Sequence, residues 1–124
     1  MYADTDFFLA LLKPNDWLKD KAARRYKKHK PELVSSTTTL VELMYVAREK
    51  GIDPERLVVN AANLMAFREL TLEDAIRAAH YASKNPDVGV MDCVHAACAR
   101  EDVVLSSDKT AFQKLGVKQE KLDE

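Results

Sequence analysis

The sequence predicts an α/β fold in which helices cover a mainly parallel sheet. Short extended runs alternate along the chain with longer segments whose apolar residues recur at the helical spacing of three or four. The clearest strand, residues 103–106, is apolar up to its last residue, which is typical of a strand covered on both faces. Strands joined through helices form parallel sheets, so an α/β sandwich is the expected architecture.

The expected elements follow in order along the chain. Strands are expected at residues 1–4, 32–35, 66–70, 103–106 and 117–122. Helices are expected at residues 6–13, 16–30, 38–50, 53–65, 71–82, 90–101 and 109–115.

Turn and capping residues explain several of the helix boundaries. The first helix ends before Pro14, because the residue preceding a proline avoids helical geometry. Asp16 is positioned to cap the second helix, and Gly51 to end the third. Asp53-Pro54 combines a capping aspartate with a proline at the first helical position, and Thr71-Leu72-Glu73-Asp74 resembles a capping box.

The composition is that of one ordinary globular domain, expected to span residues 1–124. The chain is 47% hydrophobic and 31% charged, with 3 glycines and 4 prolines, which excludes disordered and fibrous classes. Its net charge is −1 and its pI about 6.3. A protein that bound nucleic acid by bulk charge would be basic. If this protein binds nucleic acid, it must do so through a local basic patch or a bound metal.

The expected environment is the cytoplasm, with no membrane contact. Cys93 and Cys98 lie five apart in one expected helix, where their side chains point to different faces and are poorly placed for a disulfide. Reduced thiols suit the cytosol. The N-terminus has no basic signal region, and no apolar run approaches the ~20 residues of a membrane span.

Four acidic residues stand where acids are unusual. Asp4 and Asp108 follow expected strands, and ligands of open α/β sheets lie beyond the carboxyl ends of strands. Glu42 lies in a helix that is apolar nearly all round and is expected to be buried. Asp92 is the only acid in the apolar run 88–99. A buried carboxylate is costly unless it is paired, hydrogen-bonded or bound to a cation.

Each of these acids also has a purely structural interpretation. Glu42 could close a capping box with Thr39, and Asp92 and Asp108 could cap the helices that follow them. Asp4, taken alone, is simply an acid at the end of a strand. These structural interpretations are sufficient only if each of the four acids occupies its unusual position by coincidence, independently of the other three.

Carboxylates that meet at one edge of the sheet would repel one another. Each close pair costs ~4 kcal/mol at an effective dielectric constant of about 20, and divalent cations remove that cost. Ligand sets made only of oxygen suit Mg²⁺ or Mn²⁺ rather than zinc. The sequence has no His/Cys cluster with zinc spacing.

Four segments carry a family resemblance. They are Tyr2-Ala3-Asp4-Thr5-Asp6 with the apolar run 7–12 behind it, Ser36-Thr37-Thr38-Thr39-Leu40-Val41-Glu42-Leu43, Val90-Met91-Asp92-Cys93-Val94-His95-Ala96-Ala97, and Leu105-Ser106-Ser107-Asp108. In this order and spacing the whole chain resembles the PIN-domain family, and within it the VapC-type toxins of prokaryotic toxin–antitoxin pairs. No single segment is specific, but the four together are.

The resemblance implies a three-layer α/β/α fold with a mostly parallel sheet of about five strands. It also implies an Mg²⁺- or Mn²⁺-dependent endoribonuclease in which metal-activated water attacks the phosphodiester. The matching positions are Asp4, Glu42, Asp92 and Asp108 for the acidic metal ligands, and Thr5 and Ser107 for hydroxyl groups that support them. RNA is the implied substrate, a small antitoxin protein a further partner, and a homodimer the expected assembly.

Two departures from the family pattern affect the expected site. Asp6 stands where these proteins more often carry Asn or Ser, and it could add a ligand, face solvent or cap the first helix. We expect it to support the ligands rather than to join them. Lys109 and Thr110 follow Asp108, where relatives often have a further acid. A second metal is therefore expected to be weakly held or to arrive with substrate.

A basic run in the helix expected at 16–30 is the other candidate functional surface. We predict that Arg24, Arg25, Lys27 and Lys28 form a surface that contacts the RNA backbone or a protein partner. A solvent-exposed helix face without a binding role is the simpler interpretation. His95, one turn after Asp92, is interpreted as a core or supporting histidine. Trp17 is interpreted as an amphipathic anchor rather than a base-stacking platform.

Two other functions fit parts of the sequence. Asp4-Thr5-Asp6 resembles the start of haloacid-dehalogenase-type phosphatases, in which the first aspartate is the nucleophile. The chain is short for that fold, and no lysine or paired-acid motif follows at a convincing place. The second alternative is a non-catalytic interaction module with the PIN-like fold, against which the presence of all four acids argues.

Overall fold

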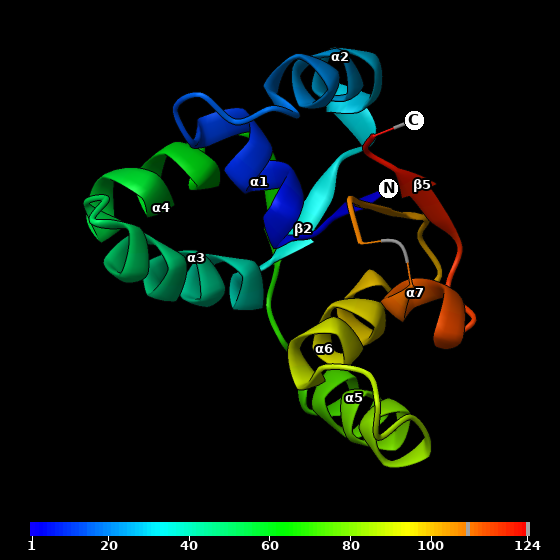
Figure 1. The fold of residues 1–124 in the computed structure, drawn as a ribbon. Coiled ribbons are helices and arrows are strands. Elements are labelled where there is room, and N and C mark those ends of the chain that lie inside the picture. The colour runs from blue at the N-terminus through cyan, green and yellow to red at the C-terminus, as the bar shows by residue number, and fades with distance from the viewer. Residues whose placement is uncertain (109, 124) are drawn as a thin grey trace.

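The computed structural model describes residues 1–108 and 110–123, and helices cover both faces of its five-stranded sheet (Figure 1). The strands are β1 (Tyr2–Ala3), β2 (Val34–Ser36), β3 (Ala66–Arg68), β4 (Val104–Ser106) and β5 (Gln119–Lys121). Their order is β3-β2-β1-β4-β5, and every neighbouring pair is parallel. The predicted α/β/α sandwich with a parallel sheet of about five strands is confirmed.

The helices form the two outer layers. They are α1 (Thr5–Leu12), α2 (Lys19–His29), α3 (Thr37–Lys50), α4 (Pro54–Ala62), α5 (Leu72–Lys84), α6 (Val90–Ala99) and α7 (Ala111–Lys114), with a 3-10 turn η1 (Lys30–Glu32). In Figure 1, α1 to α4 lie on one side of the sheet and α5 to α7 on the other. Within the described residues, no helix has the length and apolar character needed to cross a membrane.

Successive side chains of the short strands enter two separate cores, because a strand alternates its side chains between the faces of the sheet. Tyr2 and Val104 pack in the core beneath α6 and α7, whereas Ala3 and Leu105 pack in the core beneath α1 to α4. The same residues are register partners, Tyr2 with Val104 and Ala3 with Leu105. The carboxyl ends of β1 and β4 therefore end side by side at one edge of the sheet.

Several predicted boundary residues have the expected geometry. The Asp53 side chain accepts the Glu55 N–H at 3.1 Å and caps α4. Gly51 ends α3 in the left-handed region, at φ 69°, which favours glycine. Thr71 and Asp74 form a complete capping box at the start of α5.

The second helix differs from its prediction at both ends. It begins at Lys19 rather than at residue 16, and it gives way to the 3-10 turn at Lys30. Asp16 accepts the Leu18 N–H at 2.9 Å, so it stabilises the turn before the helix instead of capping the helix itself. Of the helix predicted at 109–115, α7 covers 111–114, and Lys109 lies outside the described residues.

The expectation that α3 is buried on nearly all sides is wrong. Its Leu43 and Ala47 are fully buried, but Val41, Met44 and Tyr45 are 48%, 43% and 73% exposed. The buried side of α3 packs against α1 and α4, and its opposite side remains open. Apolar residues all round a helix do not reveal which side meets the sheet, which is why the prediction failed.

Candidate active site

The four acids singled out from the sequence come together at the carboxyl edge of the sheet. Asp4 directly follows β1, Asp108 lies just after β4, Glu42 lies in the second turn of α3, and Asp92 lies in the first turn of α6. Burial raises the pKa of Asp92 to about 6, and the charges of Asp108, Asp6 and Glu42 contribute to this rise. Such mutual influence requires the carboxylates to share one small region.

Asp4 is the most buried member of the acidic cluster, which we define as Asp4, Asp6, Glu42, Asp92 and Asp108. Its side chain is hydrogen-bonded to two elements: it accepts the Phe7 N–H at 3.4 Å, which caps α1, and the Ser106 hydroxyl at 2.5 Å. Burial, followed by the charge of Asp6, raises the pKa of Asp4 to about 7, although His95 and Ser106 oppose the shift. Asp4 is thus fixed in position but electrostatically strained.

Glu42 is held by hydrogen bonds from two other helices. Its Oε1 accepts the Thr5 hydroxyl of α1 and the His95 Nε2 of α6, the latter at 2.9 Å. Burial raises the pKa of Glu42, but the hydrogen bonds from His95 and Thr5 outweigh it, and the pKa lies below its usual value. The Glu42 carboxylate therefore remains ionised.

His95 is a buried residue that links the acidic cluster to the core. Its Nδ1 lies 2.8 Å from the Tyr2 hydroxyl, which in turn lies 2.8 Å from the Ser36 hydroxyl. Burial lowers the pKa of His95, but the hydrogen bond to Glu42 and the charges of Asp4 and Glu42 raise it above its usual value. The interpretation of His95 as a core or supporting histidine agrees with these contacts.

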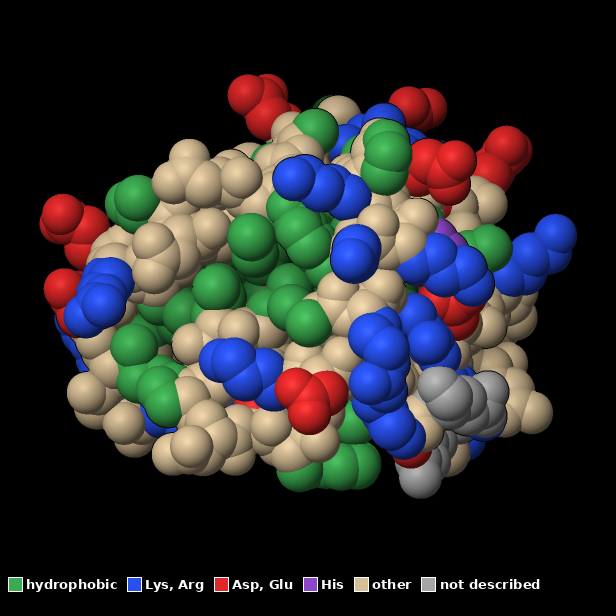
Figure 2. Space-filling view, turned by 90° about the horizontal axis from the view of Figure 1, so that it is seen from above, with side chains coloured by type: hydrophobic (Ala, Val, Ile, Leu, Met, Phe, Trp, Pro, Cys, Tyr) green, Lys and Arg blue, Asp and Glu red, His purple; other side chains and the backbone are tan. Residues whose placement is uncertain are grey.

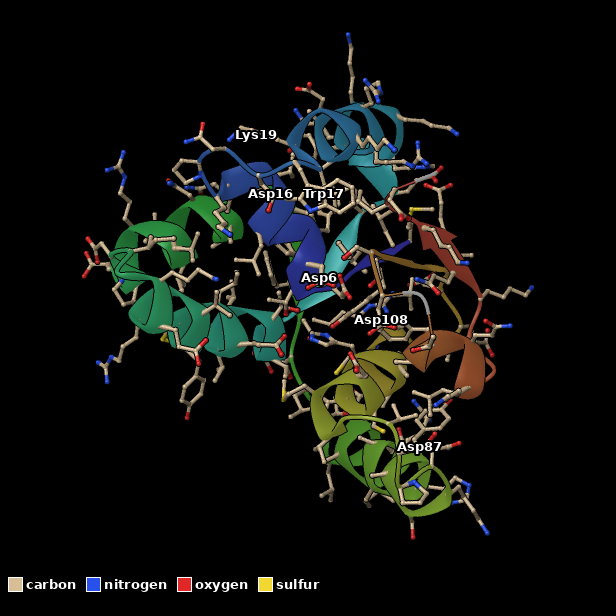
Figure 3. All side chains as sticks on the ribbon, viewed as in Figure 1. Asp6, Asp16, Trp17, Lys19, Asp87 and Asp108 are labelled. Atoms are coloured by element: carbon tan, nitrogen blue, oxygen red, sulfur yellow. The ribbon has the colours of Figure 1, made fainter. Side chains whose placement is uncertain are left out.

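Asp6 and Asp108 form the more open side of the acidic cluster, and Figure 3 shows them lying next to each other between α1 and β4. The Ser107 hydroxyl donates to Asp6 at 2.8 Å. Asp108 accepts the N–H groups of Thr110 and Ala111 at 2.9 and 2.8 Å, so it also caps the turn into α7. Burial raises the pKa of Asp6, with further contributions from Asp108 and Glu42.

The structural interpretations of the acids hold for some positions and fail for others. Asp4 is the N-cap of α1, whereas the N-cap of α7 is Thr110, and Asp108 accepts N–H groups in the turn just before that helix. Glu42 closes no capping box: the N-cap of α3 is Ser36, whereas Thr39 accepts the Ser35 hydroxyl at 2.9 Å. Asp92 is not the cap of α6 either, since Gly89 occupies that position. The two helical acids therefore have no capping role.

The sequence reasoning missed the hydroxyl groups that orient the acids. Ser106 is the last residue of β4 and holds Asp4, and Tyr2 in β1 holds His95. A signal for Ser106 was present, because a polar residue at the end of an apolar strand directly precedes the Ser107-Asp108 pair. No comparable signal existed for Tyr2, since a tyrosine in a strand is ordinarily a core residue.

The basic run lies on α2, apart from the acidic cluster. Figure 2 shows Lys and Arg side chains gathered on the side of the molecule where α2 lies. Arg24, Lys27 and Lys28 are exposed. Arg25 instead pairs with Glu120 at 3.1 Å, so its side chain helps to hold α2 against β5. Trp17 is 78% exposed and, as Figure 3 shows, lies in the α1–α2 loop away from Asp6 and Asp108.

The acidic cluster is chemically suited to a hard divalent cation. All of its members offer oxygen, and among the described residues no lysine or arginine forms an ion pair with Asp4, Asp6, Asp92 or Asp108. Within the same described part of the chain, no three His, Cys, Asp or Glu side chains converge closely enough to coordinate an ion as they stand. The structure thus presents a concentration of negative charge whose side chains would have to rotate to enclose a cation.

Comparisons with known proteins agree on the fold. The PIN domain family matches residues 1–118. A chain of the DNA-bound VapBC structure from Salmonella typhimurium is 24% identical, with a TM-score of 0.76 over 98% of this chain and 96% of that one. The VapBC-1 structure from nontypeable Haemophilus influenzae is 17% identical, with a TM-score of 0.76 over 99% of this chain and 98% of that one. The structure of FitAB bound to an IR36 DNA fragment is 17% identical, with a TM-score of 0.78 over 99% of this chain and 95% of that one. No curated protein matched the sequence.

Proposed function

Because this chain belongs to the PIN domain family, whose members are nucleases, we propose that it is an Mg²⁺- or Mn²⁺-dependent endoribonuclease and the toxin of a toxin–antitoxin pair. Residues 1–124 would act as one catalytic domain. The observation that carries the proposal is the meeting of Asp4, Glu42, Asp92 and Asp108 at one edge of the sheet, where among the described residues no lysine or arginine pairs with them. Such a cluster is costly to maintain unless it binds cations.

In this proposal Asp4, Glu42, Asp92 and Asp108 hold the cations, and Thr5, Asp6 and Ser107 support them. Bound Mg²⁺ or Mn²⁺ would supply water activation and charge stabilisation at the phosphate. The chain supplies orientation: Ser106 fixes Asp4, Thr5 fixes Glu42, and Ser107 fixes Asp6. Of these acids, the Asp92 side chain is held by the fewest contacts with the described residues. Its rotation would complete the group of carboxylates that bind the cation.

The haloacid-dehalogenase alternative is less compatible with the environment of Asp4. A nucleophilic carboxylate needs an accessible, ionised oxygen. Asp4 is only 4% exposed, both of its oxygens accept hydrogen bonds, and burial raises its pKa to about 7. Asp4 is therefore better suited to hold a cation in a fixed position than to attack a substrate.

The decisive experiment is cleavage of labelled RNA by the purified protein. Structured and unstructured RNA, and single-stranded DNA of the same sequence, are incubated with Mn²⁺, with Mg²⁺ and with EDTA. We expect cleavage of RNA only with metal, restored when metal is added back, and nearly abolished in Asp92→Asn. Asp87→Asn is the matched control, because Asp87 is 61% exposed and lies away from the acidic cluster (Figure 3). Full activity in EDTA would refute the proposal.

Two protein partners are also proposed. The solved structures similar to this chain include VapBC and FitAB complexes, which supports a small antitoxin as one partner. A homodimer is the other, and it is supported by exposed apolar side chains on the outer helices, including Leu72 and Ile76 of α5 at 79% and 63% exposure. Since a bound antitoxin could mask nuclease activity, the cleavage assay should use protein shown by mass spectrometry to be free of partners.

A further inference from the structure

A hydrogen-bonded chain runs from the core to the acidic cluster through one buried imidazole. It passes from Ser36 to Tyr2, from Tyr2 to His95 Nδ1, and from His95 Nε2 to Glu42 Oε1, with distances of 2.8, 2.8 and 2.9 Å. Three elements thus meet at His95, since Tyr2 belongs to β1, Glu42 to α3 and His95 to α6. His95 itself is only 2% exposed, so its orientation is fixed by these partners.

The partners of His95 determine which of its nitrogens carries a proton. An ionised carboxylate only accepts hydrogen bonds, so the 2.9 Å contact requires Nε2 to donate to Glu42. His95 Nε2 also lies 3.2 Å from Thr5 Oγ1, and the Thr5 hydroxyl itself donates to Glu42. At the other nitrogen, the Tyr2 hydroxyl is near Nδ1 and holds the ring plane. Both ring nitrogens are therefore engaged, and no acceptor nitrogen of the ring faces the acidic cluster.

Both described hydrogen bonds to Glu42 fall on the same oxygen. Thr5 and His95 donate to Oε1, so among the described contacts Oε2 receives none. A carboxylate that is anchored through one oxygen is pre-oriented to present the other one. Without this anchor, Glu42 would be a flexible side chain on a helix whose neighbouring residues Val41 and Tyr45 are exposed.

We propose that His95 is a positioning residue of the nuclease site: through its Nε2–H it locks Glu42 so that Oε2 faces a divalent cation, and Tyr2 locks His95. The inference rests on the proposed function, because it assumes that Glu42 is a cation ligand. It assigns His95 no contact with the cation or the substrate. It also gives Tyr2, which is fully buried, a second role besides packing.

Direct Mn²⁺ binding, measured by isothermal titration calorimetry without RNA, tests the proposal on the full chain. In His95→Leu, which fills space but donates no hydrogen bond, we expect the affinity for Mn²⁺ to fall by about 10-fold or more, as for other residues that orient ligands. In His95→Gln, whose amide nitrogen can replace Nε2, the affinity should stay within about 3-fold of the wild type. Tyr2→Phe keeps the ring and loses only the hydroxyl, so a smaller loss of affinity is expected.

A destabilised control separates positioning from folding. Leu115→Ala removes packing from the core beneath α6 and α7 without touching Glu42 or His95, and it should leave the Mn²⁺ affinity unchanged. Loss of affinity in Leu115→Ala equal to that in His95→Leu would overturn the proposal. So would unchanged affinity in His95→Leu while the wild type binds Mn²⁺. A wild type that binds no Mn²⁺ would instead refute the proposed function.

Nuclear magnetic resonance gives a second readout that a purely structural role would not produce. Long-range ¹H–¹⁵N correlation spectra of the histidine rings report the protonation of each nitrogen. We expect Nε2 of His95 to carry a proton both in metal-free protein and with saturating Mg²⁺. A ring whose Nε2 loses its proton on addition of Mg²⁺ would be a cation ligand, and the proposal would be wrong.

Discussion

Single carboxylates in this protein have opposite effects on stability, depending on their partners. Asp74 is buried beside Arg100, which donates to it at 3.1 Å, and its pKa is lowered because this pairing and the Thr71 cap outweigh burial. Asp4 and Asp92 are buried among other acids, and their pKa values rise to about 7 and about 6. A paired carboxylate stabilises the fold, whereas a carboxylate crowded by other acids costs free energy unless its charge is neutralised.

Neutralising Asp92 should separate stability from function. In EDTA, Asp92→Asn is expected to raise the melting temperature by a few degrees, or roughly 1 kcal/mol in the free energy of unfolding, because it removes repulsion from Asp108 and Asp6. The same variant should cleave almost no RNA with Mn²⁺. Thermal denaturation followed by circular dichroism measures the first effect, and a lower melting temperature than wild type in EDTA would contradict it.

Replacing Asp74 should give the opposite result and a different pH dependence. Asp74→Asn is expected to lower the free energy of unfolding by roughly 1–3 kcal/mol at pH 7, since it weakens the capping box and the Arg100 pair. A lowered pKa stabilises the folded state above the usual value of about 3.8, and this contribution is lost as the pH falls through the folded-state pKa. Urea titrations should therefore show the two proteins converging below about pH 4, and a constant difference down to pH 2 would count against this assignment.

At the scale of secondary structure, α2 has one side that packs against the sheet and one side that is exposed. Arg25 and His29 of α2 both contact Glu120 of β5, at 3.1 and 3.0 Å, and these contacts hold the helix against the sheet. Arg24 and Lys28 on the same helix are exposed. The basic run is therefore partly structural, and only its exposed members are suited to contact RNA.

Charge reversal on the exposed side of α2 tests an RNA contact. In an Asp92→Asn background, which prevents cleavage, Arg24→Glu with Lys28→Glu should weaken RNA binding about 10-fold at low salt and much less at high salt, because phosphate contacts are screened by ions. Fluorescence anisotropy across a salt series measures the effect. Lys50→Glu on α3 with Lys84→Glu on α5 is the matched control, because both lysines are exposed and the net charge changes equally, and an equal loss in that control would show that overall charge, not α2, is responsible.

The apolar side of α5 leads to a prediction about assembly. Leu72 and Ile76 are one helical turn apart and highly exposed, so they lie on one side of the helix. If this side forms the proposed homodimer, Ile76→Glu should convert the dimer to a monomer in light scattering coupled to size exclusion. Val59→Glu on α4, at a residue that is 52% exposed, should leave the dimer intact. A monomeric wild type would refute the dimer.

For the whole molecule, the sequence was sufficient for the architecture but not for the surroundings of each side chain. The run Val103-Val104-Leu105 predicted a strand covered on both faces of the sheet, and Val104 and Leu105 are indeed fully buried in β4. The contact between Glu42 and His95 joins residues 53 positions apart, and no local pattern encodes it. The exposure of Tyr45 was mispredicted for the same reason, since it depends on where α1 and α4 lie and not on α3 itself.

Metal-free protein should become less stable as the pH rises. Asp4 and Asp92 bind protons in the folded state up to about pH 7 and about pH 6, whereas unfolded aspartates release them near 3.8. The folded state therefore holds more protons between about pH 4 and pH 7, so the free energy of unfolding in EDTA falls across that range. The raised pKa of His95 acts in the same direction, because a raised histidine pKa stabilises the fold only below it.

Saturating Mn²⁺ should reverse this loss of stability. At 100 times the dissociation constant, a cation that binds only the folded state adds about 2.7 kcal/mol to the free energy of unfolding. Calorimetric scans at pH 5.5 and pH 8, with EDTA and with Mn²⁺, test both effects together. A melting temperature in EDTA that is higher at pH 8 than at pH 5.5 would contradict the raised pKa values.

The extreme shortness of the strands has an evolutionary consequence. β1 comprises only Tyr2 and Ala3, each in a different core, and the next residue is Asp4. The residues that pack in the two cores are therefore immediate neighbours of an acidic cluster residue. A substitution that repacks either core will also move Asp4. In lineages that adapt to a new temperature, we expect core substitutions to be accompanied by compensating changes near residues 2–6.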